Sequence, residues 1–259
     1  MNILVCIRRV PDPTENEIRL NRSGADIERD DLVYSINEWD NYAVEEALQI
    51  TSRVGGEVTV VTVGGEDDEE VLRRQLAMGA KHATLLADDT FASTDARGIA
   101  EILKAYIAQN HFDLILTGVQ AEAGGCQVGG MLAALLDLPF ASLVTSIEVV
   151  DAKKLKIARE VAGGNKDCSE ITLPCVLSIQ TGINEPRYVG MRGVRQVASI
   201  EIPTFDAAAL KVSGLAPKVK HGGYFVPATG AGAEILSGDR EEIVNELVER
   251  LKARGGIPA

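Results

Sequence analysis

Residues 113–136 read DLILTGVQAEAGGCQVGGMLAALL, a short apolar run followed by a glycine-rich loop and a segment with helical spacing. The apolar run, 113–117, is typical of a strand buried on both faces of a parallel sheet. Glycines after such a strand let the backbone approach a ligand, and the next helix offers unpaired N–H groups to an anion. We therefore expect a strand–loop–helix unit with a phosphate-binding loop. The loop matches neither G-x-G-x-x-G nor the Walker A pattern, and a surface turn is the alternative.

The same alternation of apolar runs and helical segments continues on both sides of this unit. Asn37 and Asp40 are placed to cap the first helix, and Gly79 is placed to end the second. This pattern predicts an α/β fold, a doubly wound, mainly parallel, Rossmann-like sheet with helices on both faces. The further strands are expected at 3–7, 57–63 and 82–86, and the helices at 38–51, 66–78, 95–109 and after Gln127.

The pattern changes after Pro139. Strands are expected at 142–150, 155–161 and 170–180, with a glycine-rich turn at 162–165. Residues 213–238 are rich in Gly, Pro and Ala without periodicity, which indicates a linker or an extended arm. A last amphipathic helix, 240–253, carries Ile243, Leu247 and Leu251 on one stripe. We expect an α/β nucleotide-binding domain at 1–205 and, at 206–259, a C-terminal arm and helix that pack on a partner subunit.

Composition excludes several classes of function. The formal net charge of −12 over 259 residues opposes binding to nucleic acid or to an anionic membrane surface. No apolar run approaches the roughly 20 residues of a membrane span, so we expect a cytoplasmic protein without membrane insertion. The four cysteines and three histidines are scattered without metal-ligand spacing, and we expect reduced thiols and no metal site.

Three predicted strands end at the same edge of a parallel sheet. Backbone groups near Cys6 and Val63 are placed to hold an adenine between apolar walls, beside Gly118. Asn37 either caps its helix or hydrogen-bonds a ribose or an adenine. No set of nucleophile, base or acid emerges, so we expect no catalytic residues. A nucleotide site without acid–base machinery indicates a cofactor carrier, whose own enzymatic activity the sequence leaves open.

Five stretches, in order, resemble electron-transfer flavoprotein beta subunits: LVCIRRVPD (4–12), SINEWDNYAVEEAL (35–48), LAMGA (76–80), the loop region 113–130 and NEPRY (184–188). The resemblance implies a heterodimer with an alpha subunit that holds most of the electron-transferring FAD. It also implies an adenine nucleotide in the beta subunit. That nucleotide is AMP in simple carriers and a second FAD in bifurcating relatives, where it takes a hydride from NADH.

The resemblance also implies particular residues. Arg187 to Gly193 resembles the loop that docks acyl-CoA dehydrogenases, with Met191 as an apolar anchor, and Glu160 matches a position linked to docking. Ordinary core packing is the alternative for Met191, and a solvated charge for Glu160. The expected nucleotide-binding residues are Cys6, Asn37, Val63, Gly118, Cys126, Gln127 and Val128, joined by the loop glycines Gly124 and Gly125.

The loop departs from the family pattern. The family's loop reads close to QAIDGDTxQVGP, with an Asp-Thr pair that helps to hold phosphates, whereas residues 120–130 read QAEAGGCQVGG. The leading hypothesis is a carrier between acyl-CoA dehydrogenase-type flavoenzymes and a quinone or other acceptor. The second is a bifurcating, NADH-oxidising form. A third, from another class, is a nucleotide-binding sensor resembling universal stress proteins, which self-dimerise and lack the arm.

Overall fold

The computed structural model describes residues 1–121, 125–220, 222–228, 230 and 232–257. The chain divides into two units, Met1–Arg19 with Glu28–Gly222, and Leu20–Ile27 with Gly223–Ala259. The first unit contains the sheet and every described residue of the predicted sites. None of the helices in the described part of the chain combines the length and apolar character that a membrane span requires.

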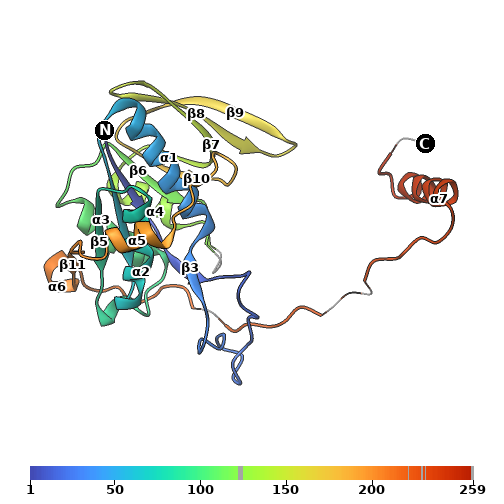
Figure 1. The fold of residues 1–259 in the computed structure, drawn as a ribbon, viewed down its shortest axis with the longest axis horizontal. Helices are drawn as coiled ribbons and strands as arrows, with labels where there is room; N and C mark the ends of the chain where they lie inside the picture. The colour runs from blue at the N-terminus through green and yellow to red at the C-terminus, as the bar shows by residue number, and fades with distance from the viewer. Residues whose placement is uncertain (122–124, 221, 229, 231, 258–259) are drawn as a thin grey trace. The chain divides into compact units, whose positions relative to one another are not determined.

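A nine-stranded sheet forms the centre of the first unit, in the order β11-β5-β4-β1-β6-β10-β7-β8-β9 (Figure 1). Strands β11 to β7 run parallel, whereas β7, β8 and β9 pair antiparallel at one edge. The predicted α/β fold is confirmed. The strand bounds are β1 Asn2–Cys6, β4 Glu57–Val63, β5 His82–Leu86, β6 Leu114–Gly118, β7 Phe140–Asp151, β8 Lys154–Val161, β9 Asn165–Thr172, β10 Cys175–Ile179 and β11 Thr204–Phe205.

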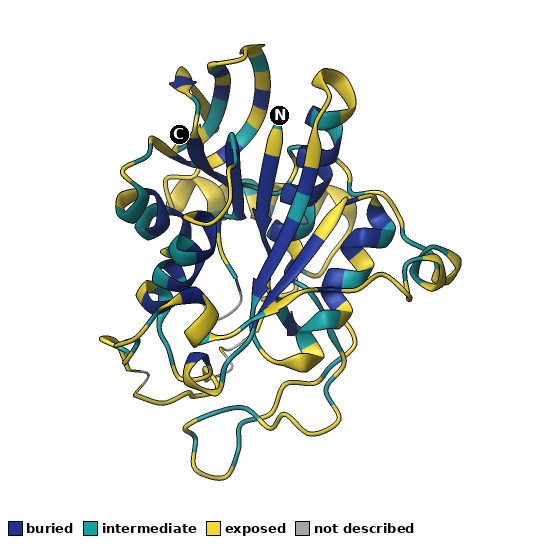
Figure 2. Cartoon of the chain, turned by 90° about the vertical axis from the view of Figure 1, so that its left-hand side faces the viewer, coloured by how far each residue is buried: buried dark blue, intermediate teal, exposed yellow. Residues whose placement is uncertain are grey.

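Helices cover both faces of this sheet, and the alternation of side chains along the strands explains how. In β1, Ile3 and Val5 belong to the core cluster that contains α1 and α2 residues, whereas Leu4 belongs to the cluster of α3 and α4. Figure 2 shows the buried central strands between helices that turn exposed faces outward. The helix bounds are α1 Glu38–Val54, α2 Glu69–Met78, α3 Ala96–Ile107 and α4 Val128–Leu136.

The single strand predicted at 170–180 is wrong. The segment contains the end of β9 and the whole of β10, separated at Leu173-Pro174. Proline has no N–H to donate to a neighbouring strand, so it interrupts the ladder. As a result β9 pairs with β8 at the antiparallel edge, and β10 lies between β6 and β7. The turn predicted at 162–165 is confirmed, since it joins β8 to β9.

Short elements complete the first unit. The hairpin strands β2 and β3 follow β1, and their pairing places Val10 opposite Ser35. Near the end of the unit, two carboxylates hold residues 206–219: Asp88 Oδ2 accepts from Ala207 N at 3.1 Å, and Asp95 Oδ2 accepts from Lys218 N at 2.6 Å. The short elements are β2 Arg9–Pro11, β3 Tyr34–Ile36, η1 Glu66–Asp68, η2 Asp89–Phe91, α5 Met191–Gln196 and α6 Ala207–Leu210.

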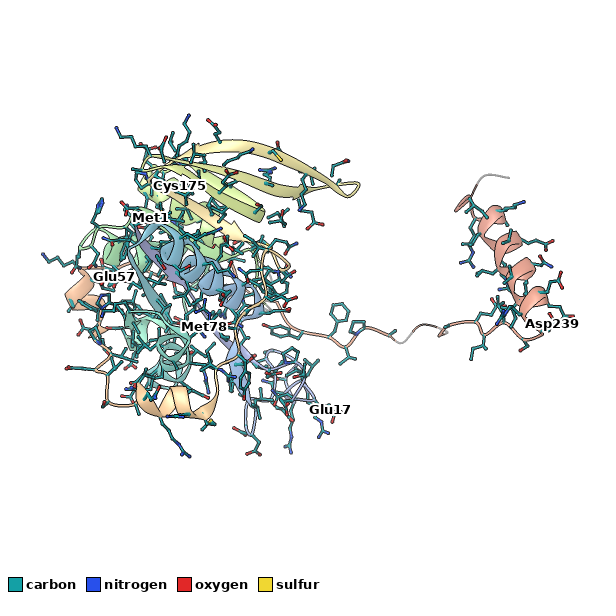
Figure 3. All side chains as sticks on the ribbon, turned by 45° about the horizontal axis from the view of Figure 1, so that its top comes forward. Met1, Glu17, Glu57, Met78, Cys175 and Asp239 are labelled. Atoms are coloured by element: carbon teal, nitrogen blue, oxygen red, sulfur yellow. The ribbon has the colours of Figure 1, made fainter. Side chains whose placement is uncertain are left out.

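The second unit contains helix α7, Arg240–Ala253, whose predicted bounds are confirmed. Asp239, labelled in Figure 3, caps this helix together with Glu242 in a capping box. Leu247 is 47% exposed, and Val244 and Leu251 are also exposed. The described residues of 213–238 form no helix or strand. This helix therefore presents an apolar stripe that its own unit does not cover.

Candidate functional site

The connection of the strands places a candidate site at the edge where β1 and β6 end. From β1 the chain moves to β4 and β5 on one side and then crosses to β6 on the other. At such a switch point the helices that follow the two strands diverge to opposite faces and leave a crevice, where ligands of open α/β sheets bind. Cys6, Val63 and Gly118 are the last residues of β1, β4 and β6, which are neighbours in the sheet. The structure thus brings these three predicted residues to one edge.

Asp40, in the first turn of α1, ties the two strand ends together. Its Oδ2 accepts from the backbone N–H of Arg8 at 2.8 Å, and its Oδ1 accepts from the N–H of Gly118 at 2.9 Å. The prediction that Asp40 helps to cap its own helix is therefore wrong, because its oxygens are used by segments that precede and follow α1. Burial raises the pKa of Asp40 to about 7, because it disfavours the charged form. Hydrogen bonds from Gly118, Asn37 and Arg8 favour the carboxylate and limit this rise.

Asn37 occupies the N-cap position of α1, but its side chain makes no cap hydrogen bond. Its Nδ2 instead donates to the carbonyl oxygen of Gln120, at 2.8 Å, in the loop after β6. The capping role is therefore wrong. Asn37 is only 1% exposed, and its Oδ1 has no hydrogen-bond partner among the described residues. A buried acceptor without a partner costs about 1–3 kcal/mol, which a ligand donor can offset.

Gly118 has a packing role at this edge. A Cβ at this position would lie 2.4 Å from Asp40 Oδ1 and 2.7 Å from Trp39 Cβ. Any side chain here would therefore displace the first turn of α1 from the end of β6. The absence of a side chain at Gly118 allows the Asp40 bridge to form.

The glycine-rich loop leads directly into α4. Gly125, Cys126 and Gln127 are exposed and Val128 is half-buried, whereas Gly124 lies outside the described residues. Met131 is the first residue of α4 to donate back along the helix, to the carbonyl of Gln127. The preceding N–H groups of the first turn have no acceptor within the helix, so they are the groups that a helix N-terminus can offer to an anion.

The thiol of Cys6 does not reach this crevice. Cys6 is buried in the core cluster of α3 and α4, where burial and the neighbouring Asp40 raise its thiol pKa. Any contribution of Cys6 to a ligand would therefore come from its backbone. Val63 packs against the same cluster and is only partly buried.

The predicted docking segment follows β10 and is held against α1. Arg187 donates from Nε to Glu45 Oε2 at 2.8 Å and from Nη2 to Glu45 Oε1 at 2.9 Å. Tyr188 is 89% exposed and Met191 is 69% exposed. Core packing as the alternative for Met191 is therefore wrong. The two large side chains form an exposed apolar pair on a segment that is anchored at Arg187.

Glu160 is linked to the start of α1 through the side chain of Gln180. Its Oε2 accepts from Gln180 Nε2 at 3.1 Å, and Gln180 Oε1 accepts from Trp39 Nε1 at 3.0 Å. Among the described residues, no hydrogen bond or ion pair joins Glu160 to Arg187 or Met191. Glu160 thus supports the start of α1 through one intermediate side chain. Sequence reasoning missed Gln180, whose apolar surroundings in the predicted strand gave no signal.

A cleft of about 720 Å³ lies between the start of α1, α2 and the docking segment. Its lining includes Asn37, Trp39, Arg187 and Tyr188, and Met78, labelled in Figure 3, lies at the end of α2. A second cavity, of about 430 Å³, lies along the start of α3 and contains none of the predicted site residues. Of the predicted nucleotide-binding residues, the first cleft is lined by Asn37, whereas Cys6, Val63 and Gly118 do not line it.

Comparisons with known proteins show what this chain is similar to. The family described as "Electron transfer flavoprotein domain" matches residues 25–210. An electron transfer flavoprotein subunit beta of Bacillus subtilis is 34% identical, over 99% of this chain and 100% of its own. Caffeyl-CoA reductase-Etf complex subunit CarD of Acetobacterium woodii is 33% identical, over 98% of this chain and 99% of its own. Protein FixA of Azotobacter vinelandii is 34% identical, over 81% of this chain and 76% of its own.

Proposed function

Because the chain belongs to the electron-transfer flavoprotein beta subunit family, we propose that it pairs with an alpha subunit to form an electron carrier. The carrier moves electrons between acyl-CoA dehydrogenase-type flavoenzymes and a quinone or another acceptor in the cytoplasm. Most of its FAD is held by the alpha subunit, and FAD supplies the reversible redox chemistry when bound. The observation that supports the proposal most directly is the switch-point edge that joins β1, β4 and β6 within a family match covering residues 25–210.

The residues at this edge fit an adenine nucleotide. The buried Oδ1 of Asn37 needs a hydrogen-bond donor, which an adenine amino group or a ribose hydroxyl provides. Backbone groups at Cys6, Val63 and Gly118 surround the base, and the first turn of α4 with Gln127 holds phosphate. Gly124, Gly125, Cys126 and Val128 complete the proposed loop. We propose AMP in this site, as a structural group without redox chemistry.

Two surfaces serve the proposed partners. The exposed apolar pair Tyr188 and Met191, with the anchored Arg187, docks the flavoenzyme, and Glu160 supports this interaction through Gln180. The apolar stripe of α7 packs on the alpha subunit, because an exposed stripe of this kind marks an interaction site. The long segment before α7 fits an arm that extends over a partner.

The proposal is tested by co-expressing the chain with its alpha subunit. The purified complex should carry flavin, and that flavin should be reduced by an acyl-CoA dehydrogenase in the presence of its acyl-CoA substrate. A complex without flavin would refute the proposal. A flavin that accepts no electrons from any dehydrogenase of this type would refute the proposed donor.

A bifurcating carrier with a second FAD is the second candidate. One observation leaves room for it: residues 120–130 lack the Asp-Thr pair of the family's loop, so the nucleotide's phosphates are held in a different manner. Direct reduction of flavin by NADH in the purified complex would establish this alternative. No observation favours the sensor resembling universal stress proteins.

A further inference from the structure

The docking segment, Arg187 to Gly193, starts in the irregular stretch after β10 and ends in the first turn of α5, which begins at Met191. Residues 180–190 contain no helix or strand, and the side chain of Tyr188 within this stretch is almost fully exposed. A segment without a backbone ladder requires side-chain contacts to keep one conformation. The contacts that hold residues 180–190 therefore determine how Tyr188 is presented and how the chain enters α5 at Met191.

One carboxylate supplies three of these contacts. Glu45, in α1, accepts both guanidinium hydrogen bonds of Arg187 described above, and its Oε2 also accepts from the backbone N–H of Arg187 at 3.2 Å. The side chain of Glu45 is 5% exposed, whereas that of Arg187 is 48% exposed. A two-pronged arginine–carboxylate pair fixes direction as well as distance. Glu45 therefore fixes both the backbone and the side chain of Arg187.

The neighbouring carboxylate holds the start of the same segment. Glu46 Oε2 accepts from Asn184 Nδ2 at 3.1 Å, and the same Nδ2 also donates to the carbonyl of Tyr42 at 3.1 Å. Burial opposes ionisation of Glu45, but its hydrogen bonds from Arg187 and Gln49 outweigh this and lower its pKa. Burial raises the pKa of Glu46. Of the two carboxylates, Glu45 is the one whose pKa is lowered by its contacts with the segment.

We propose that Glu45 is a positioning residue for partner recognition: it fixes Arg187 so that Tyr188 and Met191 are presented in a preformed docking surface. The inference rests on the proposed function, since it assigns the docking segment to a flavoenzyme partner. Holding a loop in its bound conformation raises affinity because less ordering remains to be done on binding. Loss of the anchor should therefore raise KM for the partner by about tenfold and leave kcat nearly unchanged.

The test uses the complex with the alpha subunit and the isosteric variant Glu45→Gln. A second variant, Arg187→Lys, keeps a positive charge at position 187 and a bond that trypsin can cleave. It removes the two-pronged hydrogen bonding to Glu45. The matched control is Glu101→Gln, which disturbs the Arg97–Glu101 pair on α3, on the opposite face of the sheet. Two readouts are compared: KM and kcat with the partner flavoenzyme, and the rate of trypsin cleavage after Arg187 relative to cleavage after Arg192.

The expected result is faster cleavage after Arg187 in Glu45→Gln, and about a tenfold higher KM in both docking variants. Glu101→Gln should match the wild type in both readouts. Unchanged KM in Glu45→Gln, with flavin content and melting temperature retained, would overturn the proposal. A wild-type complex that accepts no electrons would refute the proposed function instead, and the cleavage comparison would still decide whether Glu45 orders the segment.

Discussion

Two adjacent glycines in α4 provide a stringent test of the packing around the candidate site. A Cβ at Gly129 would lie 2.3 Å from Ser178 Oγ and 2.9 Å from Thr117 Oγ1, and these two hydroxyls are buried and hydrogen-bonded to each other at 2.8 Å. A Cβ at Gly130 would have the ring of Phe140 as its nearest neighbour, at an ordinary 3.5 Å. The same substitution to alanine should therefore have opposite effects at neighbouring positions.

The magnitudes follow from two opposing terms. Alanine in a helix is more favourable than glycine by about 0.5–1 kcal/mol, and this term applies to both variants. Overpacking a closely packed contact costs about 1–3 kcal/mol, and this term applies only to Gly129→Ala. Gly130→Ala should therefore be stabilised by about 0.5–1 kcal/mol. Gly129→Ala should be destabilised by up to about 2 kcal/mol once its helix gain is subtracted.

Thermal melting of the two variants and the wild type measures this difference. For a protein of this size, 1 kcal/mol corresponds to roughly 2–4 °C in Tm. Gly129→Ala should melt below the wild type and Gly130→Ala slightly above it. If the two variants melted together, the close approach of α4 to β6 and β10 would not be limiting, and the reasoning would be refuted.

Three further predictions concern charge and surface. Because burial raises the pKa of Asp40 to about 7, the folded protein keeps this proton to higher pH than the unfolded chain, so wild-type stability should fall relative to Asp40→Asn between about pH 4 and 7. The free energy of unfolding should fall by at most about 1.4 kcal/mol per pH unit, and the fall should stop above pH 8. Denaturant titrations of the wild type and Asp40→Asn measure it, and a difference in unfolding free energy that does not change with pH would contradict the assigned burial. Arg192 and Arg195 are exposed and have no ion-pair partner in the described part of the chain. If the flavoenzyme presents an acidic surface to them, the double variant Arg192→Gln with Arg195→Gln should raise KM for that flavoenzyme a few-fold at low salt and little at high salt. Stopped-flow reduction across a salt series would measure this, and equal effects at all salt concentrations would exclude electrostatic docking. Leu247→Asp should leave the melting of the isolated chain unchanged and lower co-purification of the alpha subunit, and full retention of the subunit would show that the stripe is not the interface.

Periodicity was sufficient to predict the elements that occupy a regular environment. The strands at 57–63 and 82–86 and the helix at 240–253 have the predicted bounds, because each has an uninterrupted apolar pattern. The prediction of one strand at 170–180 failed because apolar residues continue on the far side of Pro174. A pattern of apolar side chains carries no information about the backbone N–H that proline lacks.

The contacts that shape the candidate site were not predictable in the same way. Capping rules assigned Asn37 and Asp40 to their own helix, because these rules consider only neighbours along the chain. In the structure, Asp40 bonds to Gly118, 78 residues later, and Glu45 bonds to Arg187, 142 residues later. Two adjacent carboxylates on a helix with a buried apolar face, Glu45 and Glu46, were the available signal. No role was assigned to them from the sequence, although both are buried.

The measurement that tests the central claim most directly is the nucleotide content of the complex with the alpha subunit. The purified complex is denatured, and the released FAD and AMP are quantified per dimer. One FAD with one AMP is the predicted result, with the AMP released from the edge formed by β1, β4 and β6. Two FADs without AMP would contradict the simple carrier and make residues 118–130 part of a redox-cofactor site, and a complex without flavin would contradict the account as a whole.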